Sequence, residues 1–235
     1  MNRKLIAIGV GAGDGRYLTI SAKEKIENSD IIYYPVVSKG EKSMALESIK
    51  KYVKTGTKLC ELVFPMKKTG LERAWQMAAD TINETLEKEG HSSFITIGDV
   101  MTFSTFSYLR DRLEFDIDVE YEPGITSYQV ASSAIGEHLG LGKSGFGILP
   151  GIESEKQCLD LFEYFDTLAI LKPCEKSVGY LEKISKKMDI EVKSVTYGGY
   201  EKMEVRSELD YSYKLPYMSV LLVKRIRNNG GDFSE

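Results

Sequence analysis

Asp99 is the acidic residue of a short polar turn that follows an apolar run, Phe94–Ile97. The run is rich in β-branched and aromatic residues, which is typical of a buried parallel strand. Gly98 lets the backbone approach a ligand closely, and open α/β sheets bind ligands at the carboxyl ends of their strands. Three hydroxyl side chains follow: Thr102, Ser104 and Thr105. The spacing suits a polar ligand site, and it suits equally a turn that caps a helix over Met101–Leu113.

A glycine-rich loop, Gly9–Gly15, follows an earlier apolar run and precedes a helical pattern. Such a loop is typical of dinucleotide-binding folds. The match fails because a GxGxxG pattern that starts at Gly9 needs glycine where Asp14 stands. The second strand also ends in Tyr-Tyr-Pro at 33–35, without the acidic residue that binds ribose. No GKS or GKT follows the glycines, so a phosphate-binding P-loop is excluded as well.

Strand and helix patterns alternate along the first half of the chain. Strands are predicted at Leu5–Val10, Ile31–Tyr34, Lys58–Val63, Phe94–Ile97 and Ile117–Tyr121. Apolar residues at helical spacing lie between them, as in the pattern from 71 to 86. This alternation predicts a mainly parallel sheet with helices on both faces.

Glu122, Pro123 and Gly124 mark a domain boundary, because Pro and Gly interrupt helices and strands alike. Further strands are predicted at Gly145–Leu149, Thr167–Leu171, Glu191–Thr196 and Tyr217–Lys224, with helical patterns over 128–139, 158–165 and 180–188. The last strand is a continuous apolar run, typical of a central position. We therefore predict two consecutive α/β domains, 1–121 and 122–235, the second with a mixed sheet and a disordered tail at 227–235.

The composition narrows the class of protein. A net charge of −4 over 235 residues argues against a general nucleic-acid binder. The cysteines, Cys60, Cys158 and Cys174, are far apart and form no CxxC pair, so we expect buried free thiols and no metal site. No apolar run is long enough to span a bilayer and no signal peptide is recognised, so we expect a cytoplasmic protein without a membrane partner.

Three motifs resemble the signatures of the tetrapyrrole methylases, in matching order and spacing. They are GVGAGDGRYLT at 9–19, TIGD at 96–99 followed by MTFSTFSYL at 101–109, and PGITS at 123–127. LPG at 149–151, LK at 171–172, GGY at 198–200 and the last strand extend the resemblance over the whole chain. Ala12 and Val100 replace prolines that the family usually has, which affects rigidity more than chemistry. Within the family, the sequence looks most like the precorrin-2 carbon-20 methyltransferases.

The resemblance implies an S-adenosylmethionine-dependent methyltransferase whose two α/β domains hold the cofactor in a cleft between them, usually as a homodimer. It implies methylation of precorrin-2 or cobalt-factor II at carbon 20, which gives precorrin-3A or cobalt-factor III and releases S-adenosylhomocysteine. Carried onto this sequence, the family's cofactor contacts fall at Ala12, Ile97, Gly98, Asp99, Thr102, Thr126, Ser127, Leu171 and Gly199. Helix capping is the structural alternative for Thr126 and Ser127.

This chemistry asks little of side chains, because a methyl group on a sulfonium is already activated and gains most from alignment and exclusion of water. Only the loss of a proton from the methylated carbon needs a base, for which Asp99 and Tyr217 are the candidates. The carboxylates of the substrate need a cation, and Lys172, at the end of a buried strand, is the candidate. A solvated lysine is the alternative for Lys172.

Other functions remain open from the sequence. Relatives in the same family methylate uroporphyrinogen, later precorrins, a translation factor or ribosomal RNA, and the acidic balance disfavours only the last substrate. A cofactor-binding sensor without catalysis belongs to a different class. Turnover with a supplied tetrapyrrole separates the two classes, since an enzyme releases S-adenosylhomocysteine and a sensor only binds.

Overall fold

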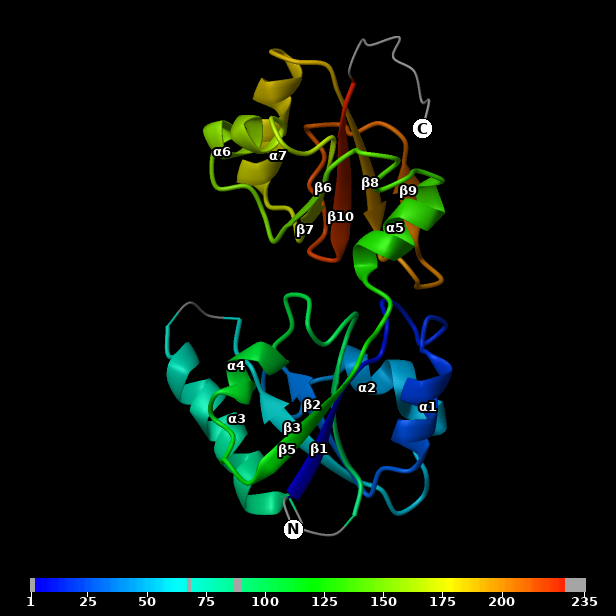
Figure 1. Cartoon of the computed structure of the whole chain (residues 1–235), viewed down its shortest axis with the longest axis vertical. Helices are drawn as coiled ribbons and strands as arrows, with labels where there is room; N and C mark the ends of the chain where they lie inside the picture. The colour runs from blue at the N-terminus through cyan, green and yellow to red at the C-terminus, as the bar shows by residue number, and fades with distance from the viewer. Residues whose placement is uncertain (1–2, 67–68, 87–89, 227–235) are drawn as a thin grey trace. The chain divides into compact units, whose positions relative to one another are not determined.

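The chain forms two compact units, Met1–Thr126 and Ser127–Glu235. The computed structural model describes residues 3–66, 69–86 and 90–226 (Figure 1), so the predicted disordered tail at 227–235 lies outside the described residues. The division falls between Thr126 and Ser127, whereas the sequence predicts a boundary after residue 121. Each unit is a layered α/β structure with its own sheet.

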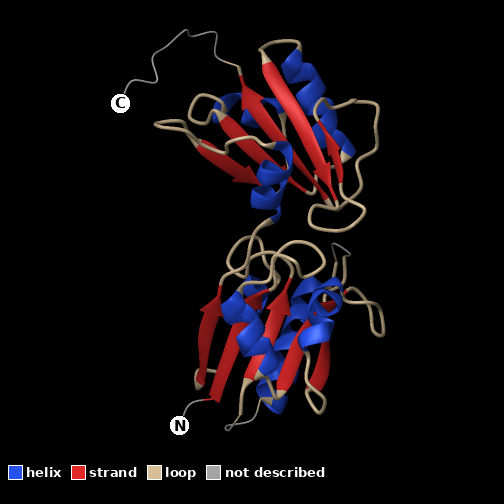
Figure 2. Ribbon diagram, turned by 90° about the vertical axis from the view of Figure 1, so that its right-hand side faces the viewer, coloured by secondary structure: helices blue, strands red, loops and turns tan. Residues whose placement is uncertain are grey.

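Unit 1 contains a parallel five-stranded sheet. Its strands are β1 (Arg3–Gly9), β2 (Ile31–Val36), β3 (Lys58–Val63), β4 (Ser92–Thr96) and β5 (Ile117–Glu122). Their order is β3-β2-β4-β1-β5, and every pair is parallel, so all the carboxyl ends lie at one edge (Figure 2). The strand for which the sequence predicts an end before Pro35 continues to Val36, because beyond Tyr33 it pairs with β3 alone.

Helices cover both faces of this sheet, as predicted (Figure 1). They are α1 (Ile20–Glu27), α2 (Met44–Ile49), the 3-10 helix η1 (Lys50–Tyr52), α3 (Leu71–Thr85) and α4 (Phe106–Arg110). One face packs Leu5 and Phe94 against Ile82 of α3, and the other packs Ile8 and Ile95 against α1 and α2. Alternate residues of the central strands therefore face opposite cores, which is the origin of their continuous apolar runs.

Unit 2 contains a mixed sheet, which confirms that part of the prediction. Its strands are β6 (Phe146–Leu149), β7 (Thr167–Leu171), β8 (Ile190–Thr196), β9 (Glu204–Arg206) and β10 (Ser219–Arg225), in the order β6-β7-β10-β8-β9. The predicted central strand is confirmed, since β10 lies between β7 and β8 and is antiparallel to both. The edge strand β9 is not predicted by the sequence, because three polar or half-exposed residues carry no apolar period.

Helix α5 (Ser127–Ile135) packs on one face of this second sheet, and α6 (Glu155–Leu161) and α7 (Glu175–Ser185) cover the other (Figure 1). The sequence predicts α7 only from Tyr180, but the helix begins after Cys174, its N-cap residue. Cys174 is exposed and Cys60 is only partly buried, so the prediction of buried thiols is confirmed for Cys158 and wrong for Cys174. Burial raises the pKa of the Cys158 thiol to about 12.

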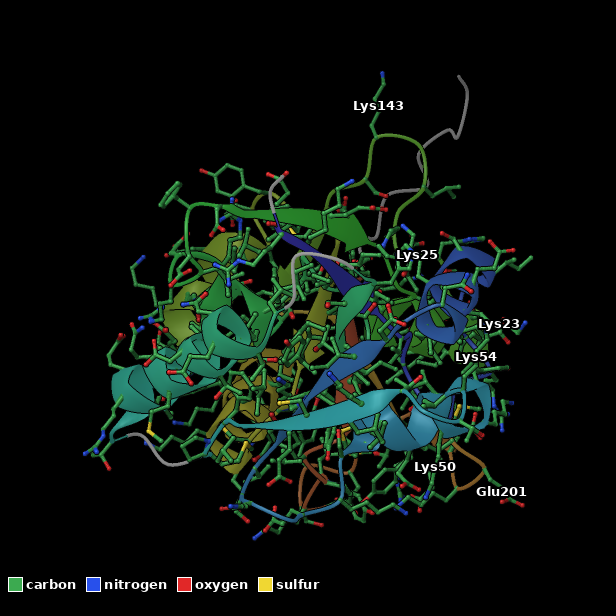
Figure 3. All side chains as sticks on the ribbon, turned by 90° about the horizontal axis from the view of Figure 1, so that it is seen from below. Lys23, Lys25, Lys50, Lys54, Lys143 and Glu201 are labelled. Atoms are coloured by element: carbon green, nitrogen blue, oxygen red, sulfur yellow. The ribbon has the colours of Figure 1, made fainter. Side chains whose placement is uncertain are left out.

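Several lysines lie on the surface of α1 and η1, among them Lys23, Lys25 and Lys50, which Figure 3 labels. Their charges are balanced locally: Lys23 pairs with Glu27 at 3.0 Å, and Lys50 approaches Glu47 at 3.8 Å. Lys25 contacts two carboxylates of β5. In the parts of the chain that the structure describes, no helix is long and apolar enough to cross a membrane, and no group of His, Cys, Asp and Glu could hold a metal ion.

Candidate functional site

Three turns meet at the carboxyl ends of β4, β1 and β5, which are neighbours in the sheet. Gly11 and Gly98 form an isolated bridge, with amide-to-carbonyl distances of 3.1 and 2.9 Å in the two directions. The amide of Ala12 donates to the carbonyl of Ile125 at 2.9 Å. The glycine-rich loop, the turn after β4 and the segment after β5 are thus joined by their backbones, and we call this group the strand-end cluster.

The glycines of this cluster serve two different purposes. A Cβ atom added to Gly124 would lie 2.1 Å from the carbonyl oxygen of Gly98, and one added to Gly9 would lie 2.6 Å from the same oxygen. These two glycines allow the three backbones to pack together. Gly98 differs, because its φ is +74° and a Cβ there would meet no atom within 4 Å. Its Cα therefore borders open space beside the main chain, where a ligand has room.

Asp99 holds the turn after β4 in shape. Its Oδ1 accepts hydrogen bonds from the amide of Met101 at 3.0 Å and from the hydroxyl of Thr102 at 2.8 Å. Its Oδ2 accepts from the amide of Gly124 at 3.1 Å, across to the segment after β5. Both carboxylate oxygens are thus engaged in positioning the cluster.

This arrangement corrects the predicted helix over Met101–Leu113, since α4 covers only Phe106–Arg110. Residues 101–105 form an irregular turn because Asp99 draws in the amide of Met101 and because Phe103 has a φ of +50°. The Ser104 hydroxyl accepts from the amide of Phe106, the first residue of α4, at 3.1 Å, although the N-cap position is taken by Thr105. The buried hydroxyl of Thr105 has no hydrogen-bond partner in the described part of the chain.

Glu122 ties the start of α1 to the end of β5, a role that the sequence did not indicate. It is 7% exposed and accepts from Ser21 at 2.8 Å and from Lys25 at 2.7 Å. Burial raises the pKa of Glu122, but the hydrogen bonds from Lys25 and Ser21 outweigh it, so the pKa lies below its ordinary value. The carboxylate stays ionised and fixes the helix that follows the glycine-rich loop.

Asp99→Asn is expected to lower the free energy of unfolding of unit 1 by a measurable amount. An asparagine keeps one acceptor oxygen but turns an amide NH2 toward either Gly124 or the Met101 and Thr102 donors, and an unmet donor costs about 1–3 kcal/mol. Trp75, the single tryptophan of the chain, lies in α3 and reports on unit 1. We expect urea unfolding, followed by Trp75 fluorescence, to show that the free energy of unfolding falls by an amount in this range.

Asp14→Asn is the matched control for this change. Asp14 lies in the glycine-rich loop and pairs with Arg16 at 2.8 Å, but both side chains are exposed. Exposed ion pairs contribute at most about 1 kcal/mol. Equal losses in the two variants, or no loss in Asp99→Asn, would show that the three hydrogen bonds of Asp99 do not stabilise the cluster.

In unit 2, the ends of β7 and β8 flank the start of β10. Leu171 is the last residue of β7 and pairs with Val220. The amide of Lys172 donates to the carbonyl of Ser219 at 3.2 Å, and the Lys172 ammonium lies 5.4 Å from the ring centroid of Tyr217. Lys172 and Tyr217 are therefore brought together as neighbours, although the sequence placed them 45 residues apart on different strands.

Tyr217 does not lie in a strand, because β10 begins at Ser219. The prediction of a strand from Tyr217 is therefore wrong; Pro216 precedes it and no pairing partner is available there. The side chain is 51% exposed, and its hydroxyl makes no hydrogen bond to the residues that the structure describes. A half-exposed phenol beside an exposed ammonium is a polar contact surface and not a core position.

Gly199 lies in the turn after β8, with a φ of +83°. The same turn carries Tyr197, whose amide donates to the carbonyl of Met218 at 2.8 Å. Ser127 is the first residue of α5, and Thr126, directly before it, is buried. The predicted cofactor residues thus form two local groups, Ala12, Ile97, Gly98, Asp99, Thr102 and Thr126 in unit 1, and Ser127, Leu171 and Gly199 in unit 2.

Residues 4–207 match the model of a protein family, the Tetrapyrrole (Corrin/Porphyrin) Methylases. The chain is 32% identical over 238 residues to a Methanocaldococcus jannaschii protein named "Probable cobalt-precorrin-2 C(20)-methyltransferase". The alignment covers 96% of this chain and 97% of that protein. It is 26% identical over 231 residues to the "Cobalt-precorrin-2 C(20)-methyltransferase" of Salmonella typhimurium, with coverage of 96% and 98%.

Solved structures share the fold. A cobalamin-synthesis-related protein, CobF, from Corynebacterium diphtheriae superposes with a TM-score of 0.68 at 16% identity, over 97% of this chain and 100% of that one. A uroporphyrin-III-C-methyltransferase from Thermus thermophilus superposes with a TM-score of 0.63 at 20% identity, over 96% and 93%. The likeness therefore extends over both units of the chain.

Proposed function

The chain belongs to the tetrapyrrole methylases and is a methyltransferase, and we propose that it methylates carbon 20 of precorrin-2 or cobalt-factor II, using S-adenosylmethionine. The observation that carries this proposal is the pair of relatives described above, both named for carbon 20 and both matched over nearly their whole length. The cobalt form is favoured, because both of these relatives carry cobalt in their names and match 96% of this chain. A relative named "Precorrin-2 C(20)-methyltransferase", without cobalt, is 23% identical and matches only 66% of the chain.

The strand-end cluster suits S-adenosylmethionine. The open space beside Gly98 gives room for a ligand against the main chain. Among the residues assigned to the cofactor, only Asp99 carries a charge, and that charge is negative. A sulfonium compound with a protonated amino group is cationic, so a single carboxylate surrounded by hydroxyl and main-chain groups is a favourable setting. When bound, the cofactor supplies an activated methyl group.

We assign different tasks to the two candidate catalytic residues. Asp99 keeps the turn after β4 in place through three hydrogen bonds, and its negative charge attracts the cofactor. We assign the hydroxyl of Tyr217, which is exposed to solvent, the role of a relay: it accepts the proton that leaves the methylated carbon, directly or through a water molecule, while it passes its own hydroxyl proton to solvent water. Lys172, beside the Tyr217 ring, binds a carboxylate of the substrate.

Lys172→Met and Tyr217→Phe are expected to separate binding from turnover. Lys172→Met removes the cation, so the KM for the tetrapyrrole rises by about tenfold, which corresponds to about 1.4 kcal/mol. Tyr217→Phe keeps the ring under Lys172 and removes only the hydroxyl, so single-turnover methyl transfer slows by about 10²-fold. The affinity for S-adenosylhomocysteine, measured by calorimetry, stays nearly constant in both variants.

Lys176→Met is the control, since Lys176 is also an exposed lysine of unit 2 and lies a short way along the chain from Lys172, in α7. An equal rise of KM in the control would show that Lys172 acts only through net charge. Unchanged turnover in Tyr217→Phe would remove Tyr217 from the catalytic residues.

A product assay tests the proposed function. The purified protein is incubated with S-adenosylmethionine and, in separate reactions, precorrin-2, cobalt-factor II and uroporphyrinogen, and the products are identified by mass spectrometry. We expect one added methyl group on the cobalt compound, with slower or no reaction of uroporphyrinogen. Methylation of uroporphyrinogen alone would contradict the proposal. Binding of S-adenosylhomocysteine without turnover of any of the three would favour the sensor.

A further inference from the structure

Phe103 has an unusual backbone. Its φ of +50° lies in the left-handed region, which bulky residues rarely adopt. Among the described residues, the other non-glycine residues with positive φ are Lys172 and Tyr197. Each of the three follows a strand: Phe103 comes after β4, Lys172 after β7 and Tyr197 after β8. Local strain is thus confined to the turns at which the candidate site residues lie.

The strain at Phe103 is imposed by its surroundings. Asp99 fixes Met101 and Thr102 on one side, and the hydrogen bond that Ser104 accepts from the amide of Phe106 fixes the other side. The turn, which precedes α4 in Figure 1, is therefore held at both ends with Phe103 at its middle. Such strain persists only where neighbouring contacts over-determine it, and it is found mainly at functional sites.

The Phe103 ring contributes little to the stability of unit 1. Its side chain is 51% exposed, and Met101, two residues earlier, is 65% exposed. Neither belongs to either apolar core of the unit. A glycine at 103 would adopt the same backbone without strain, so stability alone does not explain a phenylalanine here.

We propose that Phe103, together with Met101, contacts the broad apolar ring face of the tetrapyrrole, and so contributes to the choice of substrate. This inference rests on the proposed function. Aromatic rings and thioethers adapt well to flat, polarisable surfaces. Phe103 and Met101 carry no charge, so they suit the apolar ring face of the tetrapyrrole and not the carboxylates at its periphery. Phe103 lies in the same turn as Asp99 and comes directly after Thr102, whose hydroxyl donates to Asp99 and which is among the residues assigned to the cofactor.

The test is equilibrium binding of cobalt-factor II in the presence of S-adenosylhomocysteine, followed by the absorbance of the tetrapyrrole. In Phe103→Gly, we expect the Kd for cobalt-factor II to rise by about tenfold or more, as is typical of an aromatic side chain that becomes covered when the ligand binds. The Kd for S-adenosylhomocysteine remains unchanged, and the melting temperature is equal to or above that of the unmodified protein, because the strained φ is relieved. Phe103→Leu, which keeps an apolar side chain, gives an intermediate Kd.

Phe115→Gly is the control, because Phe115 is 100% exposed and lies just before β5, at the opposite edge of the sheet. It should leave the binding of cobalt-factor II unchanged. A lower melting temperature in Phe103→Gly would overturn the inference by showing that the ring stabilises the fold. A weaker affinity for S-adenosylhomocysteine alone would overturn it by assigning the ring to the cofactor.

The outcome also separates this inference from the proposed function. If the unmodified protein methylates cobalt-factor II and Phe103→Gly binds it equally well, the inference fails and the function stands. If the unmodified protein neither binds nor methylates the compound, both fail.

Discussion

Gly124→Ala is expected to destabilise unit 1 by about 3 kcal/mol or more, the upper range for overpacking. The added Cβ would lie 2.1 Å from the carbonyl oxygen of Gly98 and 2.7 Å from the carbonyl carbon of Gly9. Both neighbours are backbone atoms in the strand-end cluster, so neither can move without breaking the Gly11–Gly98 bridge or the bond from Gly124 to Asp99. Urea unfolding followed by Trp75 fluorescence measures the loss in unit 1.

Gly56→Ala is the control for this substitution. Gly56 lies in the turn before β3 in the same unit, with a φ of +97° and no atom within 4 Å of an added Cβ. Its cost is the backbone strain alone, about 1–2 kcal/mol. If Gly124→Ala lowers the free energy of unfolding no more than Gly56→Ala does, the backbones of the three turns are not packed as closely as in this structure.

Gly98→Ala is expected to weaken the binding of S-adenosylhomocysteine by tenfold or more, equivalent to about 1.4 kcal/mol. The φ of +74° imposes a strain similar to that at Gly56, so the two variants should lose similar stability. Only at Gly98 does the new methyl group enter the space that we assign to the cofactor. Calorimetric titration of both variants, at a temperature at which both are folded, separates the effect on binding from the effect on stability.

Gly98→Ala is therefore expected to bind S-adenosylhomocysteine more weakly than Gly56→Ala does. Equal affinities in Gly98→Ala and Gly56→Ala would mean that the open space beside Gly98 is not part of the cofactor site. A loss of affinity in both would point to a general loosening of unit 1.

Hydrophobic periodicity predicts most of the fold because burial determines it. The continuous run in β10 identifies a strand covered on both faces, and the spacing of apolar residues in α3 identifies one buried helix face. The order of strand and helix then predicts the parallel sheet of unit 1, which the structure confirms. The short edge strand β9 escapes prediction because two of its three residues are charged, its one valine is exposed, and it is paired on one side only.

Contacts between distant segments account for what the sequence could not predict. The helical pattern after Val100 is real, but the hydrogen bonds of Asp99 replace its first turn, and the partner amide of Gly124 lies 25 residues away. The strand expected from Tyr217 fails because pairing begins at Ser219. Likewise, the sequence marks Gly98 and Gly124 alike as turn residues. Only the positions of neighbouring atoms distinguish the glycine that borders open space from the one that packs.

Most of the sequence signal for the candidate site lies in its motifs. The turns around Gly98 and after Gly124 carry residue types that suggest a ligand, and the structure joins them to the loop of Ala12. Glu122 gave no such signal, because a single glutamate at a strand end is common on protein surfaces. Its burial and its bonds to Ser21 and Lys25 appear only once α1 is folded against β5.

The position of the transferred methyl group tests the central claim most directly. The protein is incubated with cobalt-factor II and S-adenosylmethionine carrying a ¹³C-labelled methyl group, and the product is analysed by ¹³C NMR and mass spectrometry. We predict one labelled methyl group, bonded to carbon 20, with release of an equal amount of S-adenosylhomocysteine. A label at any other carbon of the ring, or a bound cofactor whose label is never transferred, would contradict the assignment of this chain as a carbon-20 methyltransferase.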